Sequence, residues 1–218
     1  MLRYSFLILP LALSSCGVID DLLDSAEVAA RADELQEFVD LAEEIESAID
    51  GGESPNVDIL TEEQFNARTG EATYTGFAGL LVPDGNGEIA LTADADMTAN
   101  FDNDTVTASF DNWLGIRLDA DGNNDGLAYD ASGNINITNG AFVLNGGDIS
   151  FTANANGTLD TEENDTFTVN GGVEGSIGTN NNNNTETLAA GGTEDLVVTM
   201  NGNAVDDAQF GFGGEINN

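Results

Sequence analysis

The feature that most constrains this chain is a period-two alternation of apolar and polar residues, which begins near residue 70 and runs through the rest of the sequence. Successive side chains of a strand point to opposite faces, so alternation of this kind predicts strands with one buried face. The clearest apolar series is Leu91, Ala93, Ala95, Met97, Ala99 and Phe101. Shorter series of the same kind fall within 106–110, 135–137, 149–155, 167–173, 196–200 and 210–216.

Asparagine and glycine separate these series. Asn-Gly pairs supply the positive φ angles that tight hairpins need, so we expect a turn at each of them. Many short strands joined by such turns indicate an antiparallel meander that closes as a barrel or stacks as a sandwich. The predicted turns are Gly85-Asn86-Gly87, Asn139-Gly140, Asn145-Gly146-Gly147, Asn156-Gly157, Asn170-Gly171-Gly172 and Asn201-Gly202.

The apolar face could point to a core or to lipid. A membrane-spanning barrel carries aromatic girdles, whereas aromatic residues make up 7% of this chain and the apolar face is rich in alanine. We therefore expect a mainly β domain over 70–218, a single soluble antiparallel barrel of about eight strands. The mixture of small and large residues at 93–101 predicts a filled interior, without the roughly 300 Å³ that a drug-sized ligand needs.

A local near-repeat occurs inside this region. The hexapeptides at 98–103 and 107–112 share the order Thr-Ala-x-Phe-Asp-Asn. The period does not continue, so we interpret the pair as two similar hairpin arms and not as a solenoid.

The first sixteen residues have the pattern of a secretory signal. Arg3 precedes an apolar run over 6–13, which is too short to span a bilayer and ends in Leu13-Ser14-Ser15-Cys16. This ending resembles a bacterial lipoprotein signal, and the resemblance implies removal of residues 1–15, lipid on the Cys16 thiol and acylation of the new N-terminus. An ordinary secretory signal with a chance cysteine is the alternative, although Cys16 is the only cysteine of the chain.

The next two segments are expected to be a helix and a linker. Within 16–50, apolar residues recur at steps of three and four, which predicts an acidic amphipathic helix that ends before Gly51-Gly52. This helix could serve as a stalk, bind a partner or pack on its own domain. Residues 51–69 contain Pro55 and few apolar residues, and we assign them to a linker. The apolar stripe consists of Leu35, Phe38, Val39, Ala42, Ile45 and Ile49.

The charge and the missing residue types exclude several classes of function. Four arginines against 40 acidic residues give a formal charge of −36, which repels nucleic acid and anionic headgroups. The chain has no histidine and no lysine, and its one cysteine is assigned to lipid, so zinc sites of cysteine and histidine and the common catalytic triads are unavailable. Carboxylate pairs remain available for catalysis, but nothing in the sequence distinguishes one pair as catalytic. We therefore expect the protein not to be an enzyme.

One acidic stretch resembles the first half of a calcium loop. Asp119, Asp121, Asn123 and Asp125 place oxygen ligands at alternating positions before Gly126. The acid expected at the twelfth position of the loop is replaced by Ser132, so a complete EF-hand is not supported. The same residues also favour a turn without any metal, and both interpretations remain open.

A family resemblance begins at residue 70. The pattern made by Gly70, Ala72, Tyr74 and Gly76 resembles the first barrel strand of the transferrin-binding protein B family, and 101–106, 167–178 and 210–214 resemble later strands. The Phe-Tyr-Gly-Pro signature of the family is replaced by residues 176–179, and the chain has only one barrel. We therefore do not predict transferrin as a ligand of this chain. The resemblance implies a lipid-anchored barrel in the outer membrane that binds a protein or small-molecule cargo.

Together these features predict a surface-exposed lipoprotein of a Gram-negative outer membrane. Its barrel would bind or display an extracellular protein or a small solute, and it would touch the membrane only through its lipid anchor. Two alternatives stay open: a calcium-stabilised structural envelope lipoprotein without a specific ligand, and a lipocalin-like carrier that uses the barrel lumen.

Lipidation at Cys16 is the most direct test of this interpretation. Stable anchoring needs more than one acyl chain, at about 0.8 kcal/mol per buried CH₂. We expect labelled palmitate to enter the wild-type chain and Cys16→Ala to yield an unprocessed or soluble form. Absence of label from the wild type would contradict the lipoprotein assignment.

Overall fold

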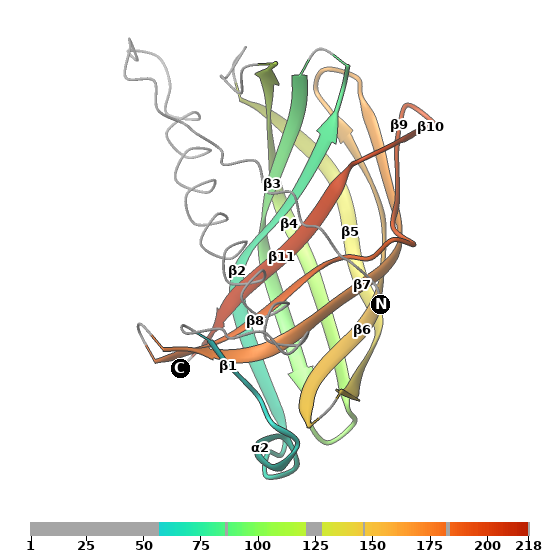
Figure 1. Ribbon diagram of the computed structural model, residues 1–218. Coiled ribbons are helices and arrows are strands. Elements are labelled where there is room, and N and C mark those ends of the chain that lie inside the picture. The colour runs from blue at the N-terminus through green and yellow to red at the C-terminus, as the bar shows by residue number, and fades with distance from the viewer. Residues whose placement is uncertain (1–56, 86, 121–127, 146, 182–183, 218) are drawn as a thin grey trace.

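The computed structural model describes residues 57–217, apart from 86, 121–127, 146 and 182–183 (Figure 1). Cys16 and the predicted amphipathic helix lie outside the described residues. No helix in the described part of the chain is long and apolar enough to cross a membrane. The elements are β1 (Val57–Ile59), α2 (Glu62–Asn66), β2 (Glu71–Pro83), β3 (Gly87–Asn100), β4 (Thr105–Asp119), β5 (Tyr129–Asn145), β6 (Asp148–Thr161), β7 (Thr166–Asn180), β8 (Thr185–Gly192), β9 (Val197–Met200), β10 (Asn203–Val205) and β11 (Gln209–Ile216).

Eight of these strands form a closed antiparallel barrel, as the sequence predicts. Each strand from β2 to β8 pairs with the next one along the chain. β8 then pairs with β11, and β11 pairs with β2 over Tyr74–Leu81, which closes the ring. Closure leaves the main wall without a free edge.

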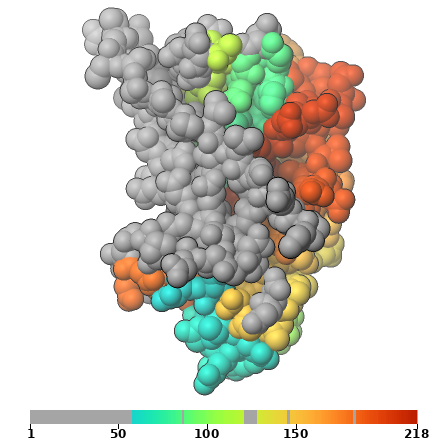
Figure 2. All heavy atoms as spheres, viewed as in Figure 1, coloured from blue at the N-terminus to red at the C-terminus, as the bar shows by residue number. Residues whose placement is uncertain are grey.

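The β9–β10 hairpin is an extension of this wall. β7 pairs with β9 over Phe167–Asn170 and with β8 over Val173–Asn180, so β8 and β9 lie one after the other along the same edge of β7. The C-terminal strands form one side of the upper barrel in the space-filling view, and α2 lies at the lower end (Figure 2).

The barrel interior is filled by the side chains that the alternation assigns to it. Ala93, Ala95, Met97 and Ala99 of β3 are at most 2% exposed. Three phenylalanines, from β4 and β11, meet inside the barrel with ring centroids 5.2–6.0 Å apart: Phe110, Phe210 and Phe212. Aromatic pairs at this separation add to the free energy gained by burial of their surface.

The lower end of the barrel is covered by part of the segment assigned to a linker. β1 pairs with β7, and the buried Phe65 of α2 packs on Phe101 and Phe142 at centroid distances of 5.6 and 4.8 Å. Thr61 and Gln64 form a capping box that starts α2. The structure therefore differs from the linker expectation at residues 57–69, because their few apolar side chains are buried against the barrel.

Three of the six predicted turns were wrong. The asparagine-glycine pairs near 86, 146 and 201 fall between strands, but those at 139, 156 and 170 lie inside β5, β6 and β7. A Cβ on Gly157 would stand 2.0 Å from the carbonyl oxygen of Asn134, and one on Gly140 would stand 2.1 Å from that of Val106. Glycine is needed at these two positions because the neighbouring backbone approaches too closely for a side chain.

A substitution at Gly76 tests how tightly β2 and β11 pack where they close the barrel. A Cβ there would lie 2.2 Å from the carbonyl oxygen of Gly213 and 2.5 Å from Cα of Gly214. We expect Gly76→Ala to lower the free energy of unfolding by about 1–3 kcal/mol through overpacking. The change in Tm, followed by circular dichroism, should be about 2–4 °C per kcal/mol in a domain of this size.

The matched control is Gly211→Ala on β11, where the nearest atom to an added Cβ is the carbonyl oxygen of Ala190 at 3.3 Å. This substitution should change Tm much less than Gly76→Ala. Equal effects of the two substitutions would show that close backbone approach at Gly76 does not limit the barrel.

Candidate binding site in the barrel wall

The barrel wall is interrupted between β4 and β5. The two strands pair from Thr105 to Ser109 and again at Leu114 and Gly115. Among the described residues, those between these two regions, 110–113 of β4 and 131–135 of β5, have no partner in the β4–β5 ladder. The two strands are therefore paired above and below an unpaired stretch of the wall.

Local backbone geometry on both strands explains the interruption. Thr92 and Asp94 of β3 pair with Leu114 and Asp111 of β4, so β4 carries one extra residue there and forms a bulge. Asn112 of this bulge has a φ of 51°, a left-handed conformation that asparagine tolerates better than most residues. On the facing strand, Gly133 has a φ of 122°.

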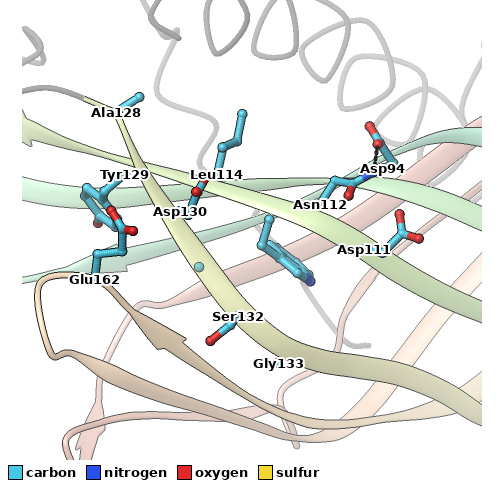
Figure 3. A pocket seen from close by; sticks show the side chains of 12 residues that line it. Asp94, Asp111, Asn112, Leu114, Ala128, Tyr129, Asp130, Ser132, Gly133 and Glu162 are labelled. Carbon is cyan, nitrogen blue, oxygen red and sulfur yellow. Dashed lines mark hydrogen bonds between the residues drawn. The ribbon is translucent and has the colours of Figure 1, made fainter.

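A groove of about 860 Å³ lies along this interruption. Its walls come from β3, β4 and β5 and from the turn between β6 and β7. Figure 3 shows Tyr129 and Glu162 at one end of the groove, and Asp94, Asn112 and Asp111 at the other. The side chains on which the following argument depends are Asp94, Asp111, Trp113, Tyr129, Asp130 and Glu162.

The groove is acidic. Four carboxylates line it, and none of the described residues that line it is basic. The amide Nδ2 of Asn112 donates a hydrogen bond of 2.7 Å to Oδ2 of Asp94, which fixes one end of the groove (Figure 3). Carboxylates gathered in a cleft raise the local concentration of cations.

Two buried side chains of the groove carry polar atoms without a hydrogen-bond partner. They are Nε1 of Trp113 and the hydroxyl of Tyr129, on residues that are 2% and 7% exposed. A buried donor left unsatisfied costs about 1–3 kcal/mol. Both atoms are closed off from solvent, so their lack of a partner is a local cost of the irregular wall beside the groove.

Tyr129 owes its position to a glycine on the facing strand. Gly115 pairs with Tyr129 across the ladder, and a Cβ on Gly115 would stand 2.4 Å from the tyrosine ring. Burial raises the pKa of Tyr129 to about 12, and the Arg117 guanidinium only partly opposes this shift. The hydroxyl is therefore neutral at physiological pH and available as a donor.

The nearby Arg117 is engaged by three acids. Its Nη1 lies 2.7 Å from Oδ2 of Asp84, its Nε lies 2.6 Å from Oε2 of Glu163, and its Nη2 bonds to Asp165. These contacts raise the pKa of Arg117, chiefly through the hydrogen bond to Glu163. Because this cation is shared among three carboxylates, it does not offset the charge of the groove.

The residues that carry the family resemblance lie elsewhere in the barrel and have structural contacts. Gly70 precedes β2 with a φ of 78°, Ala72 packs against the core, and Gly76 lies at the closure between β2 and β11. The buried Tyr74 donates a 2.6 Å hydrogen bond to Oε1 of Glu186. Burial raises the pKa of the Tyr74 hydroxyl further than that of Tyr129.

Arg68 completes this second polar cluster. It binds both carboxylate oxygens of Glu186 and lies over the Phe101 ring, 5.2 Å from its centroid. Burial acts to raise the pKa of Glu186, but hydrogen bonds from Arg68 and Tyr74 outweigh it and the pKa is lowered. The cluster is satisfied internally, so we assign it to stability and not to binding.

The predicted calcium ligands are only partly described. Asp119 ends β4, whereas Asp121, Asn123 and Asp125 lie outside the described residues. Within the described part of the chain, no group of three or more His, Cys, Asp or Glu side chains could hold a metal ion. Calcium at residues 119–125 stays a prediction.

Comparison with known proteins adds no identity. No family model, no curated protein and no solved structure matches the chain. The likeness to the transferrin-binding protein B family therefore stays a prediction that depends on the sequence pattern alone.

Tyrosine titration tests the geometry of the groove. Once residues 1–15 are absent, Tyr74 and Tyr129 are the only tyrosines. The folded pKa of Tyr129, about 12, lies above the ordinary value of about 10. Its stabilising contribution is therefore complete below pH 10 and is lost as the pH rises from about 10 to 12.

We expect the tyrosinate absorbance to rise with a midpoint near pH 12, and Tyr129→Phe to remove that step. Circular dichroism recorded at each pH identifies the range in which the fold persists. An ionisation of Tyr129 near pH 10 in the folded protein would contradict its burial in the groove.

Proposed function

We propose that this chain is a lipid-anchored binding protein of the bacterial outer membrane, and that its barrel binds a small organic cation in the β4–β5 groove. The observation that carries the proposal is the groove itself, which four carboxylates and no described basic side chain line. The anchor depends on the signal-like segment and Cys16, and the outward display depends on the family resemblance.

The two kinds of side chain define the chemistry of the ligand. Asp94, Asp111 and Asp130 favour a positively charged group, such as an ammonium. Trp113 and Tyr129 line the groove with aromatic rings, which also attract a cation. A volume of about 860 Å³ lies within the usual range for small-molecule sites. The ligand class is therefore a small organic amine.

The packed interior favours the wall groove over the lumen as the place of binding. Fully buried side chains such as Tyr74, Phe151 and Phe167 occupy the inside of the barrel. A lipocalin-like carrier would keep that space for its cargo. The calcium-stabilised structural alternative is kept as an outcome of the experiment below.

Tryptophan fluorescence provides the experiment, because Trp113 is the only tryptophan of the chain. Ethanolamine serves as the cationic probe, acetate as the anionic control and calcium chloride as the metal control. We expect ethanolamine to change Trp113 emission in a saturable way and acetate to have no effect. Asp111→Asn combined with Asp130→Asn should weaken ethanolamine binding about tenfold, which is about 1.4 kcal/mol.

The matched control is Asp96→Asn combined with Asp206→Asn, which removes the same charge from exposed positions outside the groove. Its affinity for ethanolamine should stay close to that of the wild type. Equal weakening by both double variants would mean that the total charge of the protein, and not the groove, determines ethanolamine binding. A response to calcium alone would favour the structural alternative, and no response to ethanolamine would remove the groove as a cation site.

A further inference from the structure

A second apolar cluster lies on the outer face of the barrel. Ala90 of β3 and Ile116 and Leu118 of β4 form it, and partly buried side chains from β2, from β4 and from the residue before β5 pack against them. Gly115 and Arg117, the neighbours of Ile116 on β4, lie on the opposite face of the strand. The Tyr129 ring covers Gly115 on that face. The cluster is separate from the core inside the barrel. The partly buried members are Leu81, Leu114 and Ala128.

These outward side chains are nevertheless buried. Ile116 is 3% exposed, Leu118 is 5% exposed and Ala90 is 9% exposed. Because the wall of a barrel is a single layer, a side chain on its outer face is buried to this degree only when something lies over it. The face therefore has a cover.

The described elements outside the wall lie elsewhere. α2 and β1 are at the lower end of the barrel, whereas β2 and β4 end at its upper end (Figure 1). Leu81 and Leu118 lie within the last three residues of these two strands. The β9–β10 hairpin extends from β7, which is four strands away from β3 in a ring of eight. Among the elements that the structure describes, none is placed to cover this face.

We propose that residues 35–49 of the same chain cover the outer face formed by Leu81, Ala90, Leu114, Ile116, Leu118 and Ala128. The apolar stripe predicted for this segment offers the matching surface, with Leu35, Phe38, Ala42 and Ile45 on one side. A helix about 10–12 Å wide fits a patch that spans four strands, which is about 14 Å.

The length of chain before β1 is sufficient. Residues 50–56 span up to about 24 Å when extended, and a helix over 35–49 adds about 21 Å. Their combined reach of about 45 Å exceeds the length of β2, about 41 Å for its 13 residues. The segment can therefore extend from β1, near the lower end of the barrel, to the upper ends of β2–β4.

Charge restricts where such a segment can lie. Its remaining faces carry Glu34, Glu37, Asp40, Glu43 and Glu44, and the lower outer surface of β3 and β4 carries Asp94, Asp96 and Asp111. Contact between these two acidic surfaces is unfavourable, which leaves the apolar patch as the place where the stripe can pack. The same acidic faces repel anionic headgroups, so a membrane surface is a poorer partner for this segment.

Thiol accessibility in the full chain tests this proposal. In a Cys16→Ser background, Ile116→Cys places one thiol under the proposed cover, and Thr107→Cys places a reference thiol at an exposed position of the same strand. Reaction with dithiobis-nitrobenzoate should be about tenfold slower at position 116 than at 107, because access requires local opening of the cover.

Substitutions in the segment identify the cover. Phe38→Glu combined with Ile45→Glu should remove the protection of the thiol at 116. Gln36→Glu combined with Ser47→Glu adds the same charge on the opposite side of the predicted helix, and it should preserve the protection. As a second measurement, a thiol at Phe38→Cys should form a disulfide with the thiol at 116, and one at Ser47→Cys should not.

Three outcomes would overturn the proposal. One is equal reactivity at 116 and 107, which would mean that no cover exists in solution. Another is protection that increases with protein concentration, which would assign the face to a second copy of the chain. The last is protection that appears only with phosphatidylcholine vesicles, which would assign the face to a lipid surface. Leu114 and Ala128 also line the β4–β5 groove, but position 116 is not among the lining residues and the test uses no ligand of the groove, so failure of this test and failure of the proposed function are distinguishable.

Discussion

The continuous antiparallel ladder is the constraint on which the rest of the structure depends. In a closed ring each strand satisfies its backbone groups on both sides, so local irregularities must be absorbed without opening an edge. The bulge at Asn112 and the unusual backbone at Gly133 leave one stretch of β4 and β5 unpaired within an otherwise regular wall. The candidate site is thus a consequence of register, because the same irregularity that breaks the ladder brings Trp113 and Tyr129 to the groove.

In this acidic chain, each of the described arginines forms ion pairs with particular carboxylates. Arg68 and Arg117, the two described arginines, are each held by carboxylates at opposite ends of the barrel. Arg68 supports the buried pair of Tyr74 and Glu186, whereas Arg117 gathers three acids beside the groove. Because this positive charge is already committed, the acids of the groove keep a negative field toward solvent.

The sequence predicted the fold well and the site poorly, for physical reasons that two motifs illustrate. The alternation at 91–101 predicted the inner face of β3 because side-chain direction on a strand is a local property. The repeated Phe-Asp-Asn motif was misleading: at 101–103 it lies in the turn before β4, but at 110–112 it forms the bulge inside β4. Local residues permit both conformations, and the register with β3 and β5 selects between them. The groove could not be predicted because it depends on the pairing of two distant strands.

The closure between β2 and β11 has a consequence for the order of events when the protein is made. The side chains of Thr75 and Asn217, 142 positions apart, are joined by a hydrogen bond at this seam. β2 is the first strand of the barrel and β11 the last, so the ring cannot close before almost the whole domain has been synthesised. Pairing between such distant segments slows folding, since the entropy of a long loop is lost before the contacts form. Until the last strand is available, the first strand of the barrel keeps one unpaired edge, so the domain gains its full stability only once the chain is complete through β11.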